Sequence, residues 1–334
     1  MHGSRSRTDA VRAGGGAAAA PRGRGRRRPA AILLLAVLAA VIATAVAACT
    51  GGATAASDSG KIVAIGAENE YADVISQVGG KYVQASAIMS NPNTDPHTFE
   101  ASIAVAREVG NAQLVVQNGV GYDSFMDTIE SAAPNSGRTV INVQNLLKLP
   151  DSTPNPHLWY DPTTMPQVAS AVAADLSAIQ PAHKAYFTAN AAAFTASLKP
   201  LDTAIASFKA AYAGVPVATT EPVADYLLTA LGADNLTPWT LQADIMNGVD
   251  PSPQNVAVQR SLFTEHKVKV FLYNQQVTDT LTQSFITLAD QNHIPVVGVY
   301  ETMPTPGYDY QTWMQAEVQD LRQAIADKVS TEHL

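Results

Sequence analysis

The chain has almost no cysteine, and this scarcity limits the chemistry that it can support. Its 334 residues include one cysteine, Cys49, which excludes an intramolecular disulfide and any site built from several thiolates. The motifs of phosphate loops (GxxxxGK), dinucleotide folds (GxGxxG), zinc proteases (HExxH) and serine hydrolases (GxSxG) are also absent. A bound metal ion would therefore need nitrogen and oxygen ligands, and the common hydrolytic chemistries lack a motif.

The start of the chain has the features of an export signal followed by a tether. Eight arginines and one acid lie in residues 1–29, and residues 30–48 are an uncharged apolar stretch. That stretch ends in Val-Ala-Ala-Cys, which resembles a bacterial lipobox and would place a lipid on Cys49 after removal of a signal peptide, residues 1–48. Residues 49–60, rich in Gly, Ala and Ser, would form a flexible tether. A plain membrane-anchor helix is the alternative, because nineteen apolar residues can just span a bilayer.

Positive charge is scarce in the rest of the chain. Without residues 1–48 it carries 13 Lys and Arg against 28 Asp and Glu, a net charge of about −15. Such a surface repels nucleic acid and attracts cations, so we expect no nucleic-acid partner. We place this part on the extracytoplasmic face of a bacterial cell membrane, anchored through the lipid on Cys49, and expect it to be a monomer.

Hydrophobic patterning predicts an α/β protein with two lobes. The 286 residues after Ala48 are many for one core, and β-branched runs alternate with helical stretches in both halves. This alternation is typical of parallel sheets with helices on both faces, whose ligands bind at the carboxyl ends of the strands. We expect an N-terminal lobe over residues 61–182, a linking helix over residues 183–213, kinked at Pro200, and a C-terminal lobe over residues 214–334.

Four side chains that can bind metal fall in loops that follow predicted strands or connect elements. His97 and His157 each follow a proline, so each ring is presented from a stiff loop. Glu221 and Glu301 each come directly after a predicted strand. Two imidazoles and two carboxylates suit Zn²⁺ or Mn²⁺ better than Cu⁺, which prefers sulfur. The alternatives are a histidine with only surface hydrogen bonds and a glutamate that caps the following helix.

These residues lie in motifs that resemble a known family. The segments 89–100 (MSNPNTDPHTFE), 114–119 (LVVQNG) and 155–162 (NPHLWYDP) are similar to the cluster A-I solute-binding lipoproteins of bacterial ABC importers for zinc and manganese. The similarity covers nearly all of the chain after the signal, in order. It implies two lobes, each a mainly parallel four-stranded sheet flanked by helices, joined by one long rigid helix. It also implies an ABC permease and a separate ATPase as partners.

The resemblance implies the same ligands. His97 corresponds to the histidine of the family's DPH motif, and His157 to the histidine before Trp-x-Asp-Pro. Glu221 corresponds to a histidine or glutamate after the first strand of the second lobe. The fourth family ligand is usually an aspartate after a late strand; this chain has Glu301 there, with Asp309 in reserve. The His-rich loop of many zinc-type relatives is missing, because no histidine lies between His97 and His157.

Polar residues after other strands are candidates for positioning the ligands. Glu68 follows the first predicted strand and Asn274 a later one, and each side chain could orient an imidazole, as metal-bound histidines usually require. Asp309 is a third candidate for this role. Glu68 and Asn274 could equally cap the helices that follow them.

We therefore expect an extracytoplasmic binding protein that captures a divalent transition metal between its lobes and delivers it to a permease, without acting as an enzyme. Zn²⁺ is favoured over Mn²⁺ as the cargo because nitrogen and oxygen sites bind zinc more tightly. Two alternatives use the same chain: a secreted zinc hydrolase, which would keep three protein ligands and an open water position, and a surface adhesin that uses the outer face.

Overall fold

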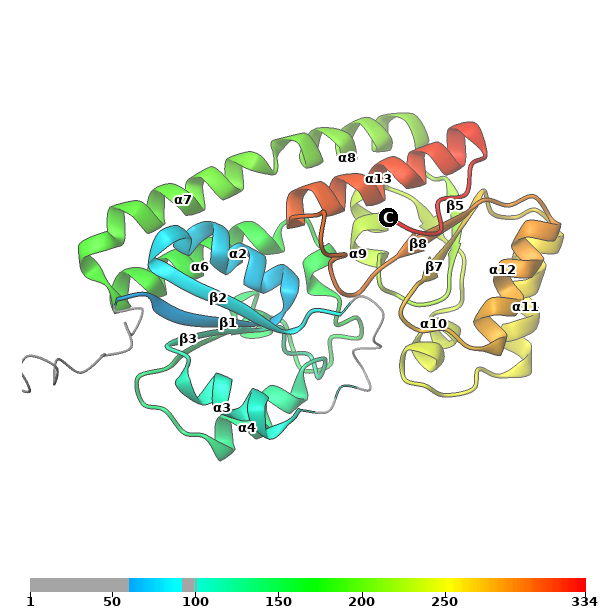
Figure 1. Ribbon diagram of the computed structural model, residues 1–334. Helices are drawn as coiled ribbons and strands as arrows, with labels where there is room; N and C mark the ends of the chain where they lie inside the picture. The colour runs from blue at the N-terminus through cyan, green and yellow to red at the C-terminus, as the bar shows by residue number, and fades with distance from the viewer. Residues whose placement is uncertain (1–59, 92–98, 100) are drawn as a thin grey trace, which may run out of the picture. The chain divides into compact units, whose positions relative to one another are not determined.

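The computed structural model describes residues 60–91, 99 and 101–334 (Figure 1). Cys49, the predicted signal peptide and most of the predicted tether lie outside the described residues, and so does His97. Residues Gly60–Leu334 form one compact unit. None of the helices in the described ranges is both long and apolar enough to cross a membrane.

The first half of this unit is built on a parallel four-stranded sheet with the order β2-β1-β3-β4. The central strands β1 and β3 are almost entirely buried, because helices cover both faces of the sheet. Helices α2 and α6 pack on one face, and α3 and α4 pack on the other. The elements are β1 (Ile62–Glu68), α2 (Asn69–Gly79), η1 (Gly80–Tyr82), β2 (Val83–Met89), α3 (Ile103–Asn111), β3 (Leu114–Gln117), α4 (Ser124–Ala132), β4 (Thr139–Asn142), α5 (Val143–Leu146), η3 (Leu158–Tyr160) and α6 (Thr164–Ile179).

The second half repeats this design with the strand order β6-β5-β7-β8, again all parallel. Helices α10, α11 and α12 cover one face through Leu241, Phe263 and Phe285, and α9 and α13 contribute to the core on the other. The elements are β5 (Pro216–Thr219), α9 (Asp225–Leu231), β6 (Asp234–Asn235), α10 (Trp239–Met246), α11 (Pro253–Thr264), β7 (Val270–Asn274), α12 (Thr280–Gln291), β8 (Val296–Val299) and α13 (Tyr310–Asp327). The predicted pair of parallel four-stranded sheets is confirmed.

The predicted linking helix is interrupted close to Pro200, where a kink was expected, so that it forms two consecutive helices. After η4 (Pro181–His183), α7 (Lys184–Ser197) packs on α6 and α2, and α8 (Lys199–Tyr212) packs on α13 and α9, so the pair connects both halves (Figure 1). The interruption falls at Leu198, which keeps helical backbone angles (φ −77°, ψ −10°). Pro200 explains it, because proline has no N–H to donate and its ring crowds the preceding turn.

A continuous buried core joins the two halves. Trp159 and Tyr160 from η3 and Trp313 and Tyr310 from α13 are all fully buried in the same cluster. The Tyr310 hydroxyl donates to the Trp159 carbonyl at 2.7 Å, and the Tyr160 hydroxyl donates to the carbonyl of Tyr300 at 2.8 Å. These contacts hold the loop after β8 against the loop that carries His157.

Candidate metal centre

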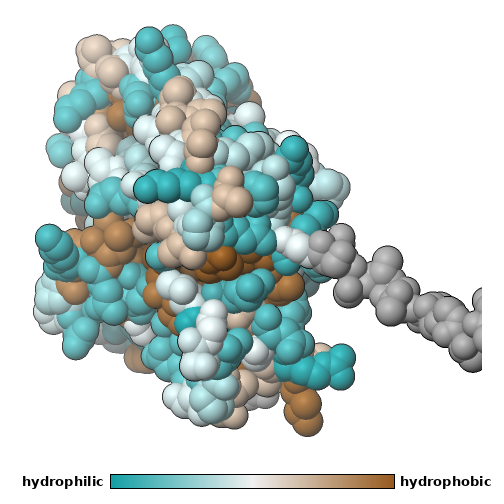
Figure 2. Space-filling view, turned by 90° about the vertical axis from the view of Figure 1, so that its left-hand side faces the viewer, coloured by the Kyte–Doolittle hydropathy of each residue, from teal (hydrophilic) through white to brown (hydrophobic). Residues whose placement is uncertain are grey.

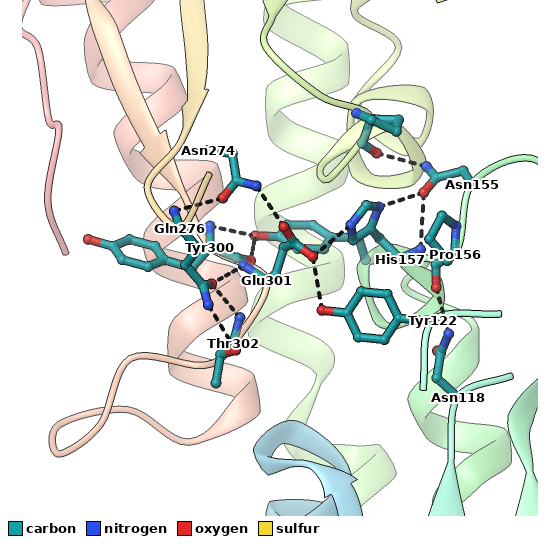
Figure 3. A network of polar contacts seen from close by, with 12 residues as sticks. Asn118, Tyr122, Asn155, Pro156, His157, Asn274, Gln276, Tyr300, Glu301 and Thr302 are labelled. Carbon is teal, nitrogen blue, oxygen red and sulfur yellow. Dashed lines mark hydrogen bonds and ion pairs between the residues drawn. The ribbon is translucent and has the colours of Figure 1, made fainter. Parts of the chain in front are cut away.

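The candidate metal centre joins a loop of the first half to the carboxyl end of the second sheet. His157 immediately precedes η3, and Glu301 follows β8 (Figure 3). Both side chains are completely buried, and the Nε2 atom of His157 lies 3.2 Å from Oε2 of Glu301. Two of the four predicted ligands are thus in direct contact, although 144 residues separate them.

The amide of Asn155 fixes which nitrogen of His157 faces the centre. Its Oδ1 accepts from the backbone N–H of His157 at 3.0 Å and lies 2.7 Å from Nδ1 of the same residue. Its Nδ2 donates to the carbonyl of Pro222 at 2.8 Å, which identifies Oδ1 as the acceptor atom. Nδ1 of His157 must therefore carry the proton, and in the neutral ring Nε2 presents a lone pair toward Glu301.

Hydrogen bonds from both halves hold the carboxylate of Glu301. Asn274 Nδ2 donates to Oε1 at 2.7 Å, and the Tyr122 hydroxyl donates to Oε2 at 2.9 Å. Gln276 Oε1 accepts from the backbone N–H groups of Glu301 and Thr302 at 2.6 and 2.7 Å, which fixes the main chain (Figure 3). Glu301 is therefore pre-positioned rather than free to choose its rotamer.

This arrangement sets two acceptors against each other. A neutral imidazole offers a lone pair at Nε2, and an ionised carboxylate offers lone pairs at Oε2, so at 3.2 Å they repel unless a proton or a cation lies between them. Both groups are buried, so water screens this repulsion poorly. The pair is chemically suited to share a positive ion.

Glu221 lies in a loop that is tied to both members of this pair. It is 2% exposed and sits between Thr220 and Pro222. The hydroxyl of Thr220 accepts from the backbone N–H of Asn274 at 3.0 Å, and the Pro222 carbonyl accepts from Asn155, as described above. Its two chain neighbours thus contact the residues that position Glu301 and His157.

Within residues 60–91, 99 and 101–334, no three His, Cys, Asp or Glu side chains lie close enough together to hold a metal ion. The described residues therefore supply a pair, His157 and Glu301, with Glu221 in an adjoining loop. His97, the remaining predicted ligand, lies outside them.

The three predicted positioning residues have different surroundings. Asn274 donates to Glu301, so it orients a carboxylate rather than an imidazole. Asp309 is exposed and caps α13, where its carboxylate accepts from the backbone N–H of Thr312 at 2.8 Å. Glu68 ends β1 at 1% exposure, and neither of its carboxylate oxygens has a hydrogen-bond partner among the described residues.

Buried acids surround the first-half side of the centre. Burial raises the pKa of Glu68 well above its usual value, and the nearby Asp123 and Glu70 add to the shift. Burial also raises the pKa of Glu70, and it raises that of Asp123 to about 6 although the Asn118 and Gly119 amides donate to Asp123. Tyr122 has a raised pKa for the same reason, reinforced by the charge of Glu301. This environment stabilises bound protons or cations and disfavours anions.

Three positioning residues were not predicted from the sequence. Asn155 lies two residues before His157 and forms an Asx-type turn, which the Asn-Pro-His segment could have indicated. Tyr122 and Gln276 do not stand in a comparable short motif. Their contacts with Glu301 span 179 and 25 residues, so only the tertiary structure identifies them.

Comparison with known proteins gives consistent matches. The family described as zinc-uptake complex component A, periplasmic, matches residues 67–324. The zinc-binding protein TroA of Treponema pallidum is 27% identical over 156 residues, which cover 45% of this chain and 50% of TroA. The manganese ABC transporter substrate-binding lipoprotein PsaA of Streptococcus pneumoniae is 22% identical over 264 residues, covering 73% of this chain and 81% of PsaA. The solved structure of the periplasmic zinc-binding protein TroA shares the fold with a TM-score of 0.68 at 18% identity, covering 81% of this chain and 100% of that one.

Proposed function

The chain belongs to the family of periplasmic zinc-uptake complex component A, and from this membership and the geometry of the centre we propose that it is the substrate-binding protein of an ABC importer. Its cargo is a divalent transition metal. The motifs that suggested this family from the sequence are confirmed by the match over residues 67–324. TroA is named as a zinc-binding protein and PsaA as a manganese-transporter lipoprotein, so the relatives include both metals. Zn²⁺ is our first choice, because sites of nitrogen and oxygen ligands bind zinc more tightly than manganese.

The contact between His157 and Glu301 is the observation that carries this proposal. Zinc lies about 2.0–2.1 Å from nitrogen and oxygen ligands, so two ligands of one tetrahedral ion are about 3.3 Å apart. Nε2 and Oε2 are buried and separated by 3.2 Å, and both atoms offer lone pairs when the imidazole is neutral and the carboxylate is ionised. The pair therefore has the spacing of two ligands of a single small cation.

We assign four ligands: His157, Glu301, Glu221 and His97, the last on the strength of its motif alone. Two carboxylates neutralise the double charge of the ion, and two neutral imidazoles complete a set of nitrogen and oxygen donors. Because imidazole must lose any added proton before it binds, capture weakens as the pH falls through the range in which histidine becomes charged.

Metal titration tests the assignment directly. Protein purified without added metal is analysed for its elements and then titrated calorimetrically with Zn²⁺ and with Mn²⁺, alone and in competition. We expect tight binding of one ion per chain, lost in His157→Ala and in Glu301→Ala and retained in His333→Ala, which changes an exposed histidine. Absence of binding, or equal binding by all four proteins, would overturn the proposal.

The same variants separate a carrier from a hydrolase. A carrier loses metal retention when Glu301 is removed, because that residue closes the coordination shell. A hydrolytic activity that disappears in Glu301→Ala while metal binding persists would favour the enzyme instead.

The carrier needs partners that are separate chains. We propose an ABC permease and its ATPase as recipients of the metal, and a lipid on Cys49 as the membrane attachment. Cys49→Ala should move the protein from the membrane fraction to the soluble extracytoplasmic fraction, and retention of the variant in the membrane would contradict lipid attachment.

A further inference from the structure

Basic side chains gather at the end of the first sheet opposite the metal centre. Lys61 directly precedes β1, Lys81 lies in η1 just before β2, and Lys184 begins α7, which follows the turn from α6. All three residues are exposed. Parallel strands begin at this edge and run toward Glu68 at the other, so the first half carries lysines at one end and buried acids at the other.

Aromatic rings hold the central lysine of this group in place. The Nζ atom of Lys81 lies 5.1 Å from the ring centre of Tyr82 and 5.9 Å from that of Tyr186. The Tyr82 ring in turn stacks on His183 with centroids 3.7 Å apart. A cation fixed over two tyrosines presents both charge and amphipathic rings to whatever lies outside.

Other charged residues lie near this edge of the first sheet. Arg138, which precedes β4 at the same edge, donates to the carbonyls of Val109, Ala133 and Glu130 and lies near the Glu130 carboxylate. Helices α6, η4 and α7 contain one acid, Asp175 on α6, and it is partly buried. The exposed positive charge in η1 and α7 is therefore that of Lys81 and Lys184, in a chain that has only 13 Lys and Arg after residue 48.

The chain enters the compact unit at this same end. Gln180, in the turn between α6 and α7, donates from Nε2 to the carbonyl of Gly60 at 2.6 Å. Ten residues lie between Cys49 and Gly60, so the eleven steps from one to the other, at 3.3–3.6 Å each, can span at most about 40 Å. Any membrane that held Cys49 would therefore lie within that distance of Gly60.

We propose that this basic surface, defined as Lys81, Lys184, Tyr82 and Tyr186, rests on the anionic phospholipid headgroups of the membrane to which the chain is anchored. Lysines near an anionic surface are attracted by its negative potential, and tyrosine rings are enriched at the level of the headgroups. Figure 2 faces this end and shows a mainly hydrophilic surface with apolar patches among the polar ones. Contact here turns the carboxyl edge of the first sheet away from the membrane. The inference rests on the proposed lipid anchor.

Vesicle binding tests the surface apart from the lipid. The compact unit, residues 60–334, has its own two sheets and continuous core, and it lacks Cys49. It is sedimented with vesicles of phosphatidylcholine alone and with vesicles that contain phosphatidylglycerol, at about 0.1 M and about 0.5 M salt. Each lysine contributes about fivefold to partitioning on an anionic surface, so Lys81→Gln/Lys184→Gln should lower binding about 25-fold. High salt should abolish binding by wild type.

The second sheet supplies a matched control. Lys267 and Lys269 are exposed lysines just before β7, so Lys267→Gln/Lys269→Gln makes the same charge change at the corresponding edge of the other sheet. We expect this pair to bind vesicles as wild type does. Equal binding to neutral and anionic vesicles, no binding by wild type, or an equal loss in both pairs would overturn the proposal.

A metal titration of the same proteins keeps the two proposals apart. Lys81→Gln/Lys184→Gln should bind metal as wild type does, because neither lysine adjoins the centre. If this double variant loses vesicle binding and keeps normal metal binding, the result bears only on the basic surface. A wild-type protein that binds vesicles without binding metal would contradict the transport function and leave the surface standing.

Discussion

The hydroxyl of Tyr122 donates a 2.9 Å hydrogen bond to Oε2 of Glu301, the same oxygen that faces Nε2 of His157. Tyr122 belongs to the loop between β3 and α4 in the first half, whereas Glu301 follows β8 in the second. The Oε2 atom of Glu301 thus contacts both Tyr122 and His157 from the first half. Because the same oxygen is proposed to bind the metal and joins the two halves, a change in the contact between the halves should alter metal binding.

Tyr122→Phe removes that donor and keeps the ring. We expect metal affinity to fall about tenfold, because hydrogen-bonded partners of metal-binding carboxylates fix their orientation. Calorimetric titration with Zn²⁺ measures the change. Tyr308→Phe, which alters a tyrosine in the loop after β8, is the control and should bind normally. Unchanged affinity in Tyr122→Phe would mean that Asn274 alone positions Glu301.

Asn155→Ala should weaken metal binding 10- to 100-fold without removing a ligand, because the Nδ1 proton of His157 loses its acceptor and the ring loses its orientation. Asn155→Asp keeps an oxygen for Nδ1 and loses the donor to the Pro222 carbonyl. It should therefore retain more affinity than the alanine variant. If both variants lose affinity equally, the contact with Pro222, and not the ring orientation, is what matters.

Most of the architecture could be predicted because its strands are buried runs rich in β-branched and aromatic residues. The strands β1, β7 and β8 carry this pattern, and the structure confirms them. The strand β6, two residues long, and helix α10 were not predicted. Asp234 and Asn235 pair with β5 because of their position beside it, and neither has the character of a strand former.

Only those residues of the candidate centre that stand in recognisable short segments could be predicted. His157 stands in a proline-stiffened motif and Glu301 directly follows an apolar strand, and the structure brings the two together. The partners of Glu301 come from distant loops, and the burial that raises the pKa of Glu68 depends on helices packed around it. Such properties arise from tertiary packing, which local patterns do not encode.

Glu68→Met tests whether the buried acid at the end of β1 has a role in binding. Its carboxyl group is buried and has no hydrogen-bond partner in the part of the chain that the structure describes. Replacing such a group by an apolar one of similar size should raise the free energy of unfolding by about 1–3 kcal/mol. Urea unfolding at neutral pH measures this, with the exposed Glu265→Met as control. We expect metal affinity to change by less than about threefold. A 10- to 100-fold loss would show that Glu68 orients a metal-bound group.

Glu317 on α13 should make stability depend on pH in the opposite direction to a carboxylate whose pKa is lowered by folding. Burial raises the pKa of its carboxyl group from 4.5 to about 8, although Trp313 Nε1 and the Tyr160 hydroxyl lie within 3.1 and 3.3 Å. The single hydroxyl proton of Tyr160 is used in the shorter bond to the carbonyl of Tyr300. A protonated Glu317 can then donate to the Tyr160 oxygen, which is consistent with the raised pKa.

The sign of the effect follows from linkage. Between about pH 4.5 and about pH 8 the folded protein keeps this proton and the unfolded chain releases it, so stability present at low pH is lost as the pH rises. The loss is at most about 1.4 kcal/mol per pH unit and stops above about pH 8. Glu317→Gln keeps a donor and an acceptor but cannot ionise, so its advantage over wild type should grow across this window. Urea unfolding from about pH 5 to about pH 9 measures the difference, with the exposed Glu265→Gln as control. Parallel stability curves for wild type and Glu317→Gln would mean that Glu317 ionises in the folded protein as it does in the unfolded chain.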